Sequence, residues 1–277
     1  MLRLFVRLAF ALPVLITVLL NFLLLIMAVI AFFVVHWYTS LFAQTFFHHR
    51  YAAHRMFIMS KFWERFFYVF SFVTQGSSYI SPEVYGILHR LHHAHADTEK
   101  DPHSPLYSRT LMSLMWKTRK IYSDLYWGKV KVEEKYLREL PEWMSFNNFA
   151  EHWSTRIGWM IVYTLFYVLF AETWWMWLFL PAHFVMGPLH GAIINWFAHK
   201  YGYANFKVND TSKNLMPVDI FMMGEGYHNN HHSLQNRANF GGIRWHELDP
   251  TYFFVKLFDK VGIIKIRPHA TSAANPG

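Results

Sequence analysis

One stretch of the chain decides how the sequence is interpreted, namely Gly224-Glu225-Gly226-Tyr227-His228-Asn229-Asn230-His231-His232. Its three histidines stand at positions i, i+3 and i+4. An α-helix advances about 100° per residue, so these three side chains share one helix face. The stretch therefore predicts three imidazoles that converge from a single helical segment, as metal ligands do.

Two further histidine clusters lie earlier in the chain. The segment His89-Arg90-Leu91-His92-His93 repeats the i, i+3, i+4 spacing, and a looser pair stands five residues apart at His49 and His54. A lone pair of this kind is expected by chance in a chain with 18 histidines among 277 residues. Three clusters together favour one shared metal centre.

The number of imidazoles predicts two metal ions, because eight clustered histidines exceed what one tetrahedral or octahedral ion binds. Asn195 and His199, four residues apart, share a helix face and would add a ninth imidazole and a weak amide ligand. The chain has no cysteine, which excludes thiolate-bound zinc, iron–sulfur clusters and disulfides. Imidazole ligands alone leave iron, copper, zinc and nickel open.

Composition indicates a membrane protein. Hydrophobic residues make up 53% of the chain and charged residues only 16%. The formal net charge of +8 is typical of loops that face the cytoplasm and anionic lipid headgroups. No basic cluster with interleaved aromatic residues is present, so the charge does not indicate nucleic-acid binding.

Two apolar blocks predict the topology. Residues 8–47 carry no formal charge, and residues 157–199 carry only Glu172. As a helix, each block would be about 60 Å long against a hydrocarbon core of about 30 Å, so each is expected to form a hairpin. The first would turn near Asn21, with one long tilted helix as the alternative. The second would turn at Glu172 and Thr173.

These hairpins predict an all-α integral membrane protein with four transmembrane helices and a cytoplasmic helical cap that holds a histidine-rich two-metal site. The expected single domain, 1–277, divides into a first hairpin, a cytoplasmic or interfacial segment, a second hairpin and a cytoplasmic C-terminal segment, at 1–47, 48–156, 157–199 and 200–277. All 26 Lys and Arg lie outside the apolar blocks, which favours cytoplasmic clusters. Two crossings per hairpin would return the chain to one side before every cluster, as a shared centre requires.

Charged residues near the clusters suggest supporting roles. Asp97, Asp101 and Glu225 are predicted to accept hydrogen bonds from metal-bound imidazoles. Loop solubility and helix capping are their alternative roles. A basic group is predicted to bind a phosphate-bearing substrate headgroup, with plain attraction to anionic lipid as the alternative; it consists of Lys117, Arg119 and Lys120.

Five segments between about Thr45 and Ile266 carry a family resemblance in their order, spacing and flanking residues; they are His49–His54, His89–Ser104, Asn195–Gly202, Gly224–His232 and Arg244–Thr251. The pattern resembles the membrane-bound fatty acid desaturases. Within them it is most similar to the acyl-CoA type, the stearoyl-CoA-like Δ9 desaturases, in the bacterial form without a cytochrome b5 domain. Zinc has no redox chemistry, so removing hydrogen from an unactivated methylene favours a different metal.

The resemblance implies a di-iron centre with Asn195 supplying a bound water. The expected iron ligands, which are also the expected catalytic residues, are His49, His54, His89, His92, His93, His199, His228, His231 and His232. It further implies an O2-dependent oxidoreductase that introduces a cis double bond, at Δ9, into a long-chain acyl group. Coenzyme A is the expected carrier of that group, with acyl carrier protein and intact lipid as alternatives, because few charged headgroup-binding positions match the family. Electrons would come from a separate ferredoxin, rubredoxin or cytochrome b5-type donor and its reductase, at the cytoplasmic face of a bacterial inner membrane.

Two other functions compete with this interpretation. A related histidine-box di-iron hydroxylase acting on a lipid or alkane would insert oxygen into its product, and the form of the Gly224–His232 stretch argues against it. A metal transporter or sensor would need ligands at mid-membrane, whereas these clusters stand at or beyond the ends of the apolar blocks.

Overall fold

The computed structural model describes residues 2–271, so the ends of the first and last predicted segments lie outside the described residues. The described chain is mostly helical, with one small antiparallel pair of strands and two long non-helical stretches on either side of α10. Its elements in chain order are α1 Leu2–Phe42, η1 Ala43–Ala53, β1 Phe57–Met59, α2 Lys61–Gln75, η2 Gly76–Ser78, α3 Pro82–His95, η3 Pro105–Tyr107, α4 Leu111–Tyr126, α5 Glu134–Leu137, α6 Met144–Glu151, α7 Trp153–Phe170, η4 Trp174–Phe179, α8 Leu180–Phe184, α9 Met186–Ala192, η5 Ile193–Phe197, α10 His228–Ser233, α11 Pro250–Lys260, β2 Ile264–Ile266 and α12 Pro268–Thr271.

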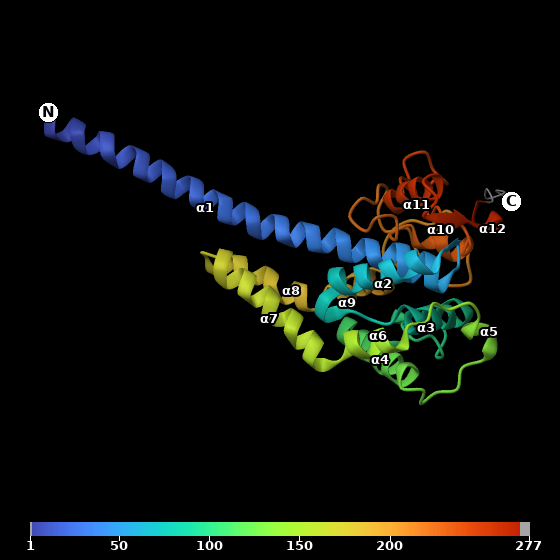
Figure 1. Cartoon of the computed structure of the whole chain (residues 1–277). Helices are drawn as coiled ribbons and strands as arrows, with labels where there is room; N and C mark the ends of the chain where they lie inside the picture. The colour runs from blue at the N-terminus through green and yellow to red at the C-terminus, as the bar shows by residue number, and fades with distance from the viewer. Residues whose placement is uncertain (1, 272–277) are drawn as a thin grey trace.

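The first apolar block is one helix, and the predicted turn near Asn21 is wrong. Helix α1 runs unbroken for 41 residues and extends away from the rest of the molecule (Figure 1). Residues 14–42 contain neither glycine nor proline, and a single asparagine costs a helix too little to end it. The N-terminus therefore lies at the opposite end of α1 from the histidine clusters. The return crossing expected within residues 1–47 is absent from the described chain.

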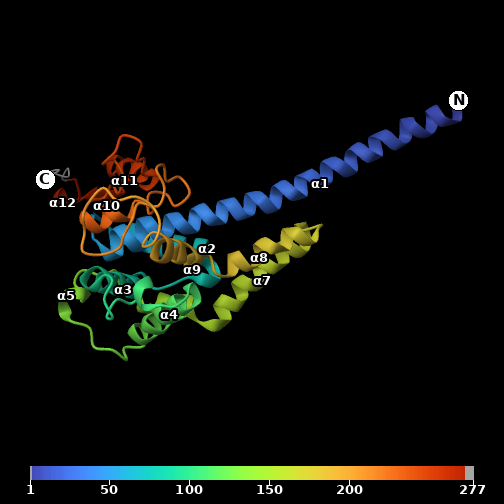
Figure 2. The ribbon, with the colours of Figure 1, turned by 180° about the vertical axis from the view of Figure 1, so that it is seen from behind.

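The second apolar block does reverse at the predicted place. Helix α7 ends at Phe170, η4 begins at Trp174, and α7 and α8 lie side by side along α1 (Figure 2). The returning arm is broken, because Trp174–Phe184 and Met186–Phe197 meet at 79°. The clusters before and after this block consequently lie at the same end of the molecule.

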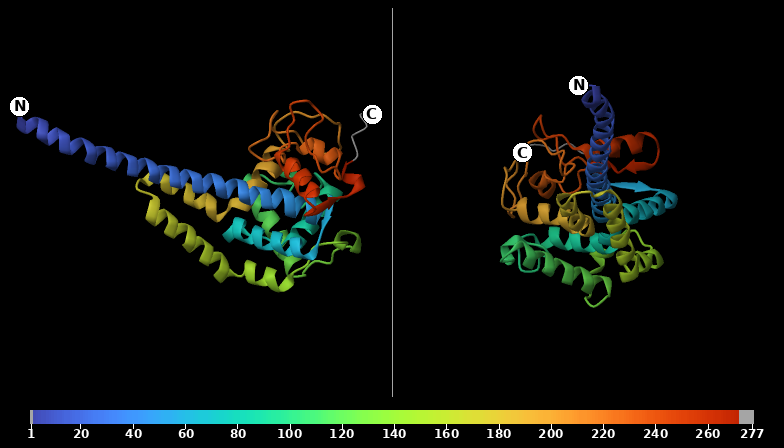
Figure 3. Two further views of the ribbon diagram at one scale, coloured as in Figure 1. Left: turned by 45° about the horizontal axis from the view of Figure 1, so that its top comes forward. Right: turned by 90° about the vertical axis from the view of Figure 1, so that its left-hand side faces the viewer.

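Within residues 2–271, one helical segment, Leu19–Ala53, is long and apolar enough to cross a membrane, and the broken arm qualifies only if its two halves count as one span. The four-helix topology is thus not observed in full. Helices α1 and α7 nevertheless project together from the histidine-rich body (Figure 3). Both present exposed apolar side chains, among them Leu19, Leu20, Leu23, Leu24, Met27, Ile30, Val34 and Val35 on α1 and Ile161, Val162, Leu165, Val168 and Leu169 on α7.

The end of α1 continues as a π-helix, which explains the loose spacing of the first histidine pair. In η1, each N–H bonds the carbonyl five residues earlier, and the N–H of His54 bonds the carbonyl of His49 at 3.1 Å. An α-helix would turn two residues five apart about 140° away from each other. The wider π turn brings His49 and His54 to the same face.

Helix α3 is built to bring the second cluster against the first. The Ser81 side chain caps its first turn and Pro82 occupies the first helical position. Arg90, between the histidines, donates to the carbonyls of Ala53 at 2.8 Å and Ala52 at 3.1 Å. These bonds dock α3 onto the end of η1, where the carbonyls of the last helical turn lack internal partners.

Short helix α10 carries the third cluster and is anchored by the two asparagines between its histidines. Asn229 and Asn230 are buried, and their side chains bond surrounding loops rather than the imidazoles. Asn230 Nδ2, for example, donates to the carbonyl of Phe240 at 3.0 Å. Before the helix, a Cβ at Gly226 would lie 2.7 Å from Asp219, whose carboxylate accepts the Gly226 N–H. The stretch around the histidines is therefore occupied by residues that hold α10 in place.

Candidate metal centre

Nine histidines from four separate segments of the chain meet in two groups, at the end of the molecule opposite the N-terminus. The five-histidine group consists of His49, His54, His89, His93 and His231. The four-histidine group consists of His92, His199, His228 and His232. In each group, one ring nitrogen of every member lies within 4.8 Å of one ring nitrogen of all the others. All nine histidines predicted from the sequence are thus brought together.

The Nε2 atoms face inward in the five-histidine group. His231 Nε2 lies 3.0 Å from His49 Nε2 and 2.9 Å from His93 Nε2, and His89 Nε2 lies 2.9 Å from both His54 and His93. Two nitrogens bound to one ion at about 2.1 Å, with ligand angles of 90–109°, stand roughly 3.0–3.4 Å apart. The spacing of the imidazoles is close to that of ligands on a single ion.

The four-histidine group has the same geometry. His92 Nε2 lies 3.2 Å from His232 Nε2, and His199 Nε2 lies 3.0 Å from His228 Nε2. All four side chains are buried. Because His92 and His93 are neighbours in α3, and His231 and His232 in α10, both helices supply residues to both groups.

Carboxylates hold the outward-facing Nδ1 atoms. His49 Nδ1 lies 2.6 Å from a carboxylate oxygen of Glu225. His92 Nδ1 lies 2.9 Å from one of Asp101, and His232 Nδ1 lies 2.8 Å from one of Asp210. A fourth carboxylate, Asp97, lies 3.5 Å from Nδ1 of His199. A carboxylate that accepts a hydrogen bond from Nδ1–H fixes the imidazole in the tautomer whose Nε2 carries the lone pair. A metal ligand needs this tautomer.

The charges of these pairs agree with this arrangement. Burial alone would raise the pKa of Asp101, but the hydrogen bond from His92 and the nearby imidazoles outweigh it and lower the pKa to about 2. Burial also raises the pKa of Glu225, but the neighbouring groups, of which His49 has the largest effect, lower it overall. Burial and neighbouring imidazoles lower the pKa values of His228 and His231 well below the usual value. The carboxylates of Asp101 and Glu225 are therefore charged near pH 7, and the imidazoles of His228 and His231 are neutral.

This donor set suits a cation. With both Nδ1 atoms bonded to carboxylates, the Nε2 lone pairs of His92 and His232 face each other at 3.2 Å in a buried site. Two lone pairs at that distance repel, and burial lowers the pKa of His232 to about 4, so that this ring is neutral near pH 7. A metal ion between them removes the repulsion and binds neutral imidazole. The residues present fit such an ion.

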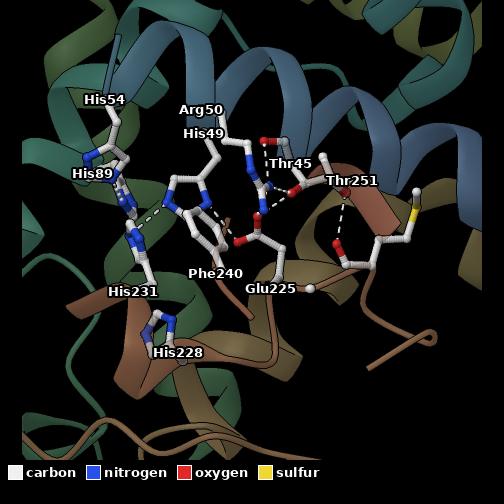
Figure 4. A network of polar contacts seen from close by, with 12 residues as sticks. Thr45, His49, Arg50, His54, His89, Glu225, His228, His231, Phe240 and Thr251 are labelled. Carbon is white, nitrogen blue, oxygen red and sulfur yellow. Dashed lines mark hydrogen bonds and ion pairs between the residues drawn. The ribbon is translucent and has the colours of Figure 1, made fainter. Parts of the chain in front are cut away.

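Arg50 joins the five-histidine group to the C-terminal segment. Its buried guanidinium lies 3.1 Å from Glu225 Oε1 and stacks over the Phe240 ring at 3.7 Å (Figure 4). It also lies 2.8 Å from Asp249 Oδ2. Thr45 donates its hydroxyl to Glu225, the carboxylate that holds His49. Two acids thus face one buried cation, and the pairing fixes Glu225 in its orientation toward His49.

The comparison with known sequences decides the family. A profile described as fatty acid desaturase matches residues 23–256, a range that contains all nine histidines. The chain belongs to the fatty acid desaturase family. The resemblance seen in the sequence is confirmed, and this desaturase is an oxidoreductase.

Several relatives of the desaturase have names that specify a reaction. A protein of Arabidopsis thaliana named Delta-9 desaturase-like 5 protein is 29% identical over 83% of this chain and 73% of its own length. The sn-1 stearoyl-lipid 9-desaturase of Anabaena variabilis is 28% identical over 82% of this chain and 79% of its own. The Acyl-CoA 5-desaturase AL21 of Anemone leveillei is 28% identical over 81% of this chain and 66% of its own.

Some candidate residues of the desaturase lie differently from expectation. Asn195 stands in the π-helix η5 rather than an α-helix, is half-buried, and makes no side-chain hydrogen bond to any residue the structure describes. Lys117 bonds the carbonyl of Asp101 at 2.8 Å, whereas Arg119 and Lys120 are exposed on α4. The basic group predicted to bind a substrate headgroup is thus divided, because Lys117 bonds the loop that contains Asp101 while the other two side chains are exposed.

Sequence reasoning missed two residues of the site. Asp210 lies 22 positions before His232 with no motif around it, and only the fold brings the two together. Arg50 could have been found, because a charge at the end of a long apolar helix signals a buried partner. His103 is also buried, with its ring 4.2 Å from that of His92.

Proposed function

We propose that this desaturase is an O2-dependent di-iron enzyme that introduces a cis double bond at the Δ9 position of a long-chain acyl group. The observation that carries the proposal is the pair of histidine groups, whose inward Nε2 atoms have the spacing of ligands on two ions. The relatives named as Delta-9 and 9-desaturases support the position of the double bond.

The nine histidines are the proposed iron ligands, five for one ion and four for the other, with Asn195 holding a water beside the second. Iron supplies the redox chemistry that an unactivated methylene requires, using O2 and two electrons from outside the chain. Glu225, Asp97, Asp101 and Asp210 act by holding the imidazoles in one tautomer and orientation. The protein thereby presents a rigid set of neutral donors.

The proposed substrate carrier bears phosphate groups. Acyl-CoA, the expected carrier, and phospholipids share this chemistry, and the names of the relatives include both acyl-CoA and stearoyl-lipid desaturases. Exposed Arg119 and Lys120 on α4 are the proposed headgroup contacts. An apolar channel in the helical body would then set which methylenes reach the irons, because the acyl chain itself offers no polar group for recognition.

The proposed site lies on the cytoplasmic side of a membrane crossed by α1 and by the α7–α8 arm. The exposed apolar side chains of α1 and α7 support this arrangement, since soluble surfaces rarely expose contiguous apolar area of this extent. The partner implied by the family is an electron donor, proposed here to be a separate ferredoxin, rubredoxin or cytochrome b5-type protein with its reductase.

Expression in a host that lacks Δ9 desaturation tests the proposal. The expected product is a cis-9 monoenoic acyl chain, found by mass spectrometry after cleavage at the double bond, with both acyl-CoA and phospholipid fractions analysed. The purified protein is expected to contain two irons per chain, and chelation should remove iron and activity together. A hydroxylated product, or another metal in stoichiometric amount, would contradict the proposal and favour the hydroxylase alternative.

Asp210 provides a test that sequence motifs would not suggest. The substitution Asp210→Asn removes the charged acceptor at His232 Nδ1 and is expected to lower metal affinity or activity by about 10–100-fold. Iron content during titration with a chelator is the measurement. Asp259→Asn on α11 is the matched control and should behave as wild type, because Asp259 is exposed and its carboxylate bonds only a backbone N–H.

A further inference from the structure

The two histidine groups are not equally shielded from solvent. Seven of the nine histidines are buried, and only His54 and His93, both in the five-histidine group, are partly exposed. Both of them line the same surface pocket, which has a volume of about 450 Å³. Among the residues the structure describes, this pocket is therefore the place where imidazoles of the centre meet solvent.

The pocket is strongly basic. Its walls carry Arg55, Arg90, Lys135 and Arg138 against one acid, Glu139. Glu139 is already paired, at 2.7 Å with Arg267 from outside the pocket and at 3.4 Å with Arg55. Arg90 is committed to backbone carbonyls, whereas Lys135 and Arg138 are exposed at the rim. Lys135 also pairs at 2.7 Å with Glu133, an exposed acid outside the pocket lining. The rim consequently presents positive charge that can attract a negatively charged partner.

The pocket also lies where a soluble molecule can reach it. His54 follows directly after the membrane-crossing segment Leu19–Ala53, and α5 lies at the end of the molecule farthest from the N-terminus (Figure 1). The apolar part of the pocket wall includes Ala53, Ala94 and Tyr136. Such a small apolar lining suits a polar surface rather than an acyl chain.

We propose that this basic pocket is the docking site of an acidic, soluble electron-carrier protein, which delivers electrons through the exposed edges of His54 and His93. The inference rests on the proposed function and names where its reductant binds. The reaction RCH2CH2R′ + O2 + 2 e⁻ + 2 H⁺ → RCH=CHR′ + 2 H2O needs two electrons that the substrate does not supply. A carrier seated here places its redox centre next to the five-histidine group without opening the buried four-histidine group.

Charge reversal at the rim tests the proposal in the full-length, iron-loaded protein. The double variant Lys135→Glu/Arg138→Glu is expected to weaken binding of a reduced plant-type ferredoxin or of soluble cytochrome b5 by about tenfold or more, because attractive rim pairs become repulsive. Its binding should also lose most of its dependence on ionic strength. The dissociation constant is measured by titration and the KM for the carrier by product formation. The matched control is Lys256→Glu/Lys260→Glu on α11, which makes the same change in net charge at exposed positions.

The possible outcomes distinguish a failure of the proposed docking site from a failure of the proposed function. A loss of carrier binding in the rim variant alone, with wild-type iron content and melting temperature, supports the pocket. Equal losses of carrier binding in both variants, or unchanged carrier binding in the rim variant, overturn the proposed docking site. Desaturation by the wild-type protein in the same experiment upholds the proposed function. A raised KM for acyl-CoA with unchanged carrier binding also overturns the docking site, and assigns the pocket to a substrate headgroup. Absence of desaturation by the wild type with every carrier is failure of the proposed function itself.

Discussion

The variant His231→Ala is expected to lose desaturase activity by at least about a thousandfold, as happens when one member of a cooperating catalytic set is removed. His231 is the link in the five-histidine group, with its Nε2 3.0 Å from that of His49 and 2.9 Å from that of His93. Its loss removes a donor from the middle of the group. Product analysis in the expression host and iron per purified chain are the two measurements.

The control for this variant is His152→Ala, because His152 is exposed and its ring contacts only Ser154 at the start of α7. It should keep full activity and iron, with a small loss of stability from the helix cap. Both variants should appear in the membrane fraction at wild-type abundance. Retained desaturation in the His231→Ala protein would remove this histidine from the proposed centre.

Arg50→Met is expected to lower the free energy of unfolding by about 3–5 kcal/mol, the cost of breaking a buried ion pair on one side. The substitution keeps most of the side-chain volume over Phe240 but leaves Glu225 and Asp249 facing each other without their shared cation. Denaturant unfolding of the iron-free protein in detergent measures this loss without a contribution from bound metal.

Arg55→Met is the comparison for stability, because Arg55 pairs at 3.4 Å with a carboxylate that is itself half exposed. Its loss should cost less than about 1 kcal/mol. Similar losses in the two variants would mean that burial of the Arg50 pairs adds little to stability. A stable Arg50→Met protein that lacks iron would instead assign Arg50 to orienting Glu225 alone.

Sequence spacing was sufficient where a regular α-helix carries the ligands. In α3 and α10, residues at i, i+3 and i+4 face one side whatever the rest of the fold. The sequence alone therefore predicts that the three histidines of each helix share one helix face. The reversal at Glu172 and Thr173 was likewise visible, because a polar pair interrupts an apolar block twice as long as a membrane is thick.

Spacing was insufficient where the backbone departs from the α-helix or a contact spans the chain. His49 and His54 align only because η1 is a π-helix, and no local propensity predicts that geometry. The first apolar block was divided wrongly, since its length permits a hairpin but nothing in residues 14–42 stops a helix.

The sequence by itself determined the ligand chemistry, the number of imidazoles and the family, because these depend on residue type and order. Only the tertiary structure decided how the nine histidines divide into groups of five and four, which carboxylates lie at the Nδ1 atoms of four of them, and that His54 and His93 alone among them reach solvent. The physical reason is that the histidines come from four segments of the chain. Their division, their partners and their exposure depend on how those segments pack, which no local pattern encodes.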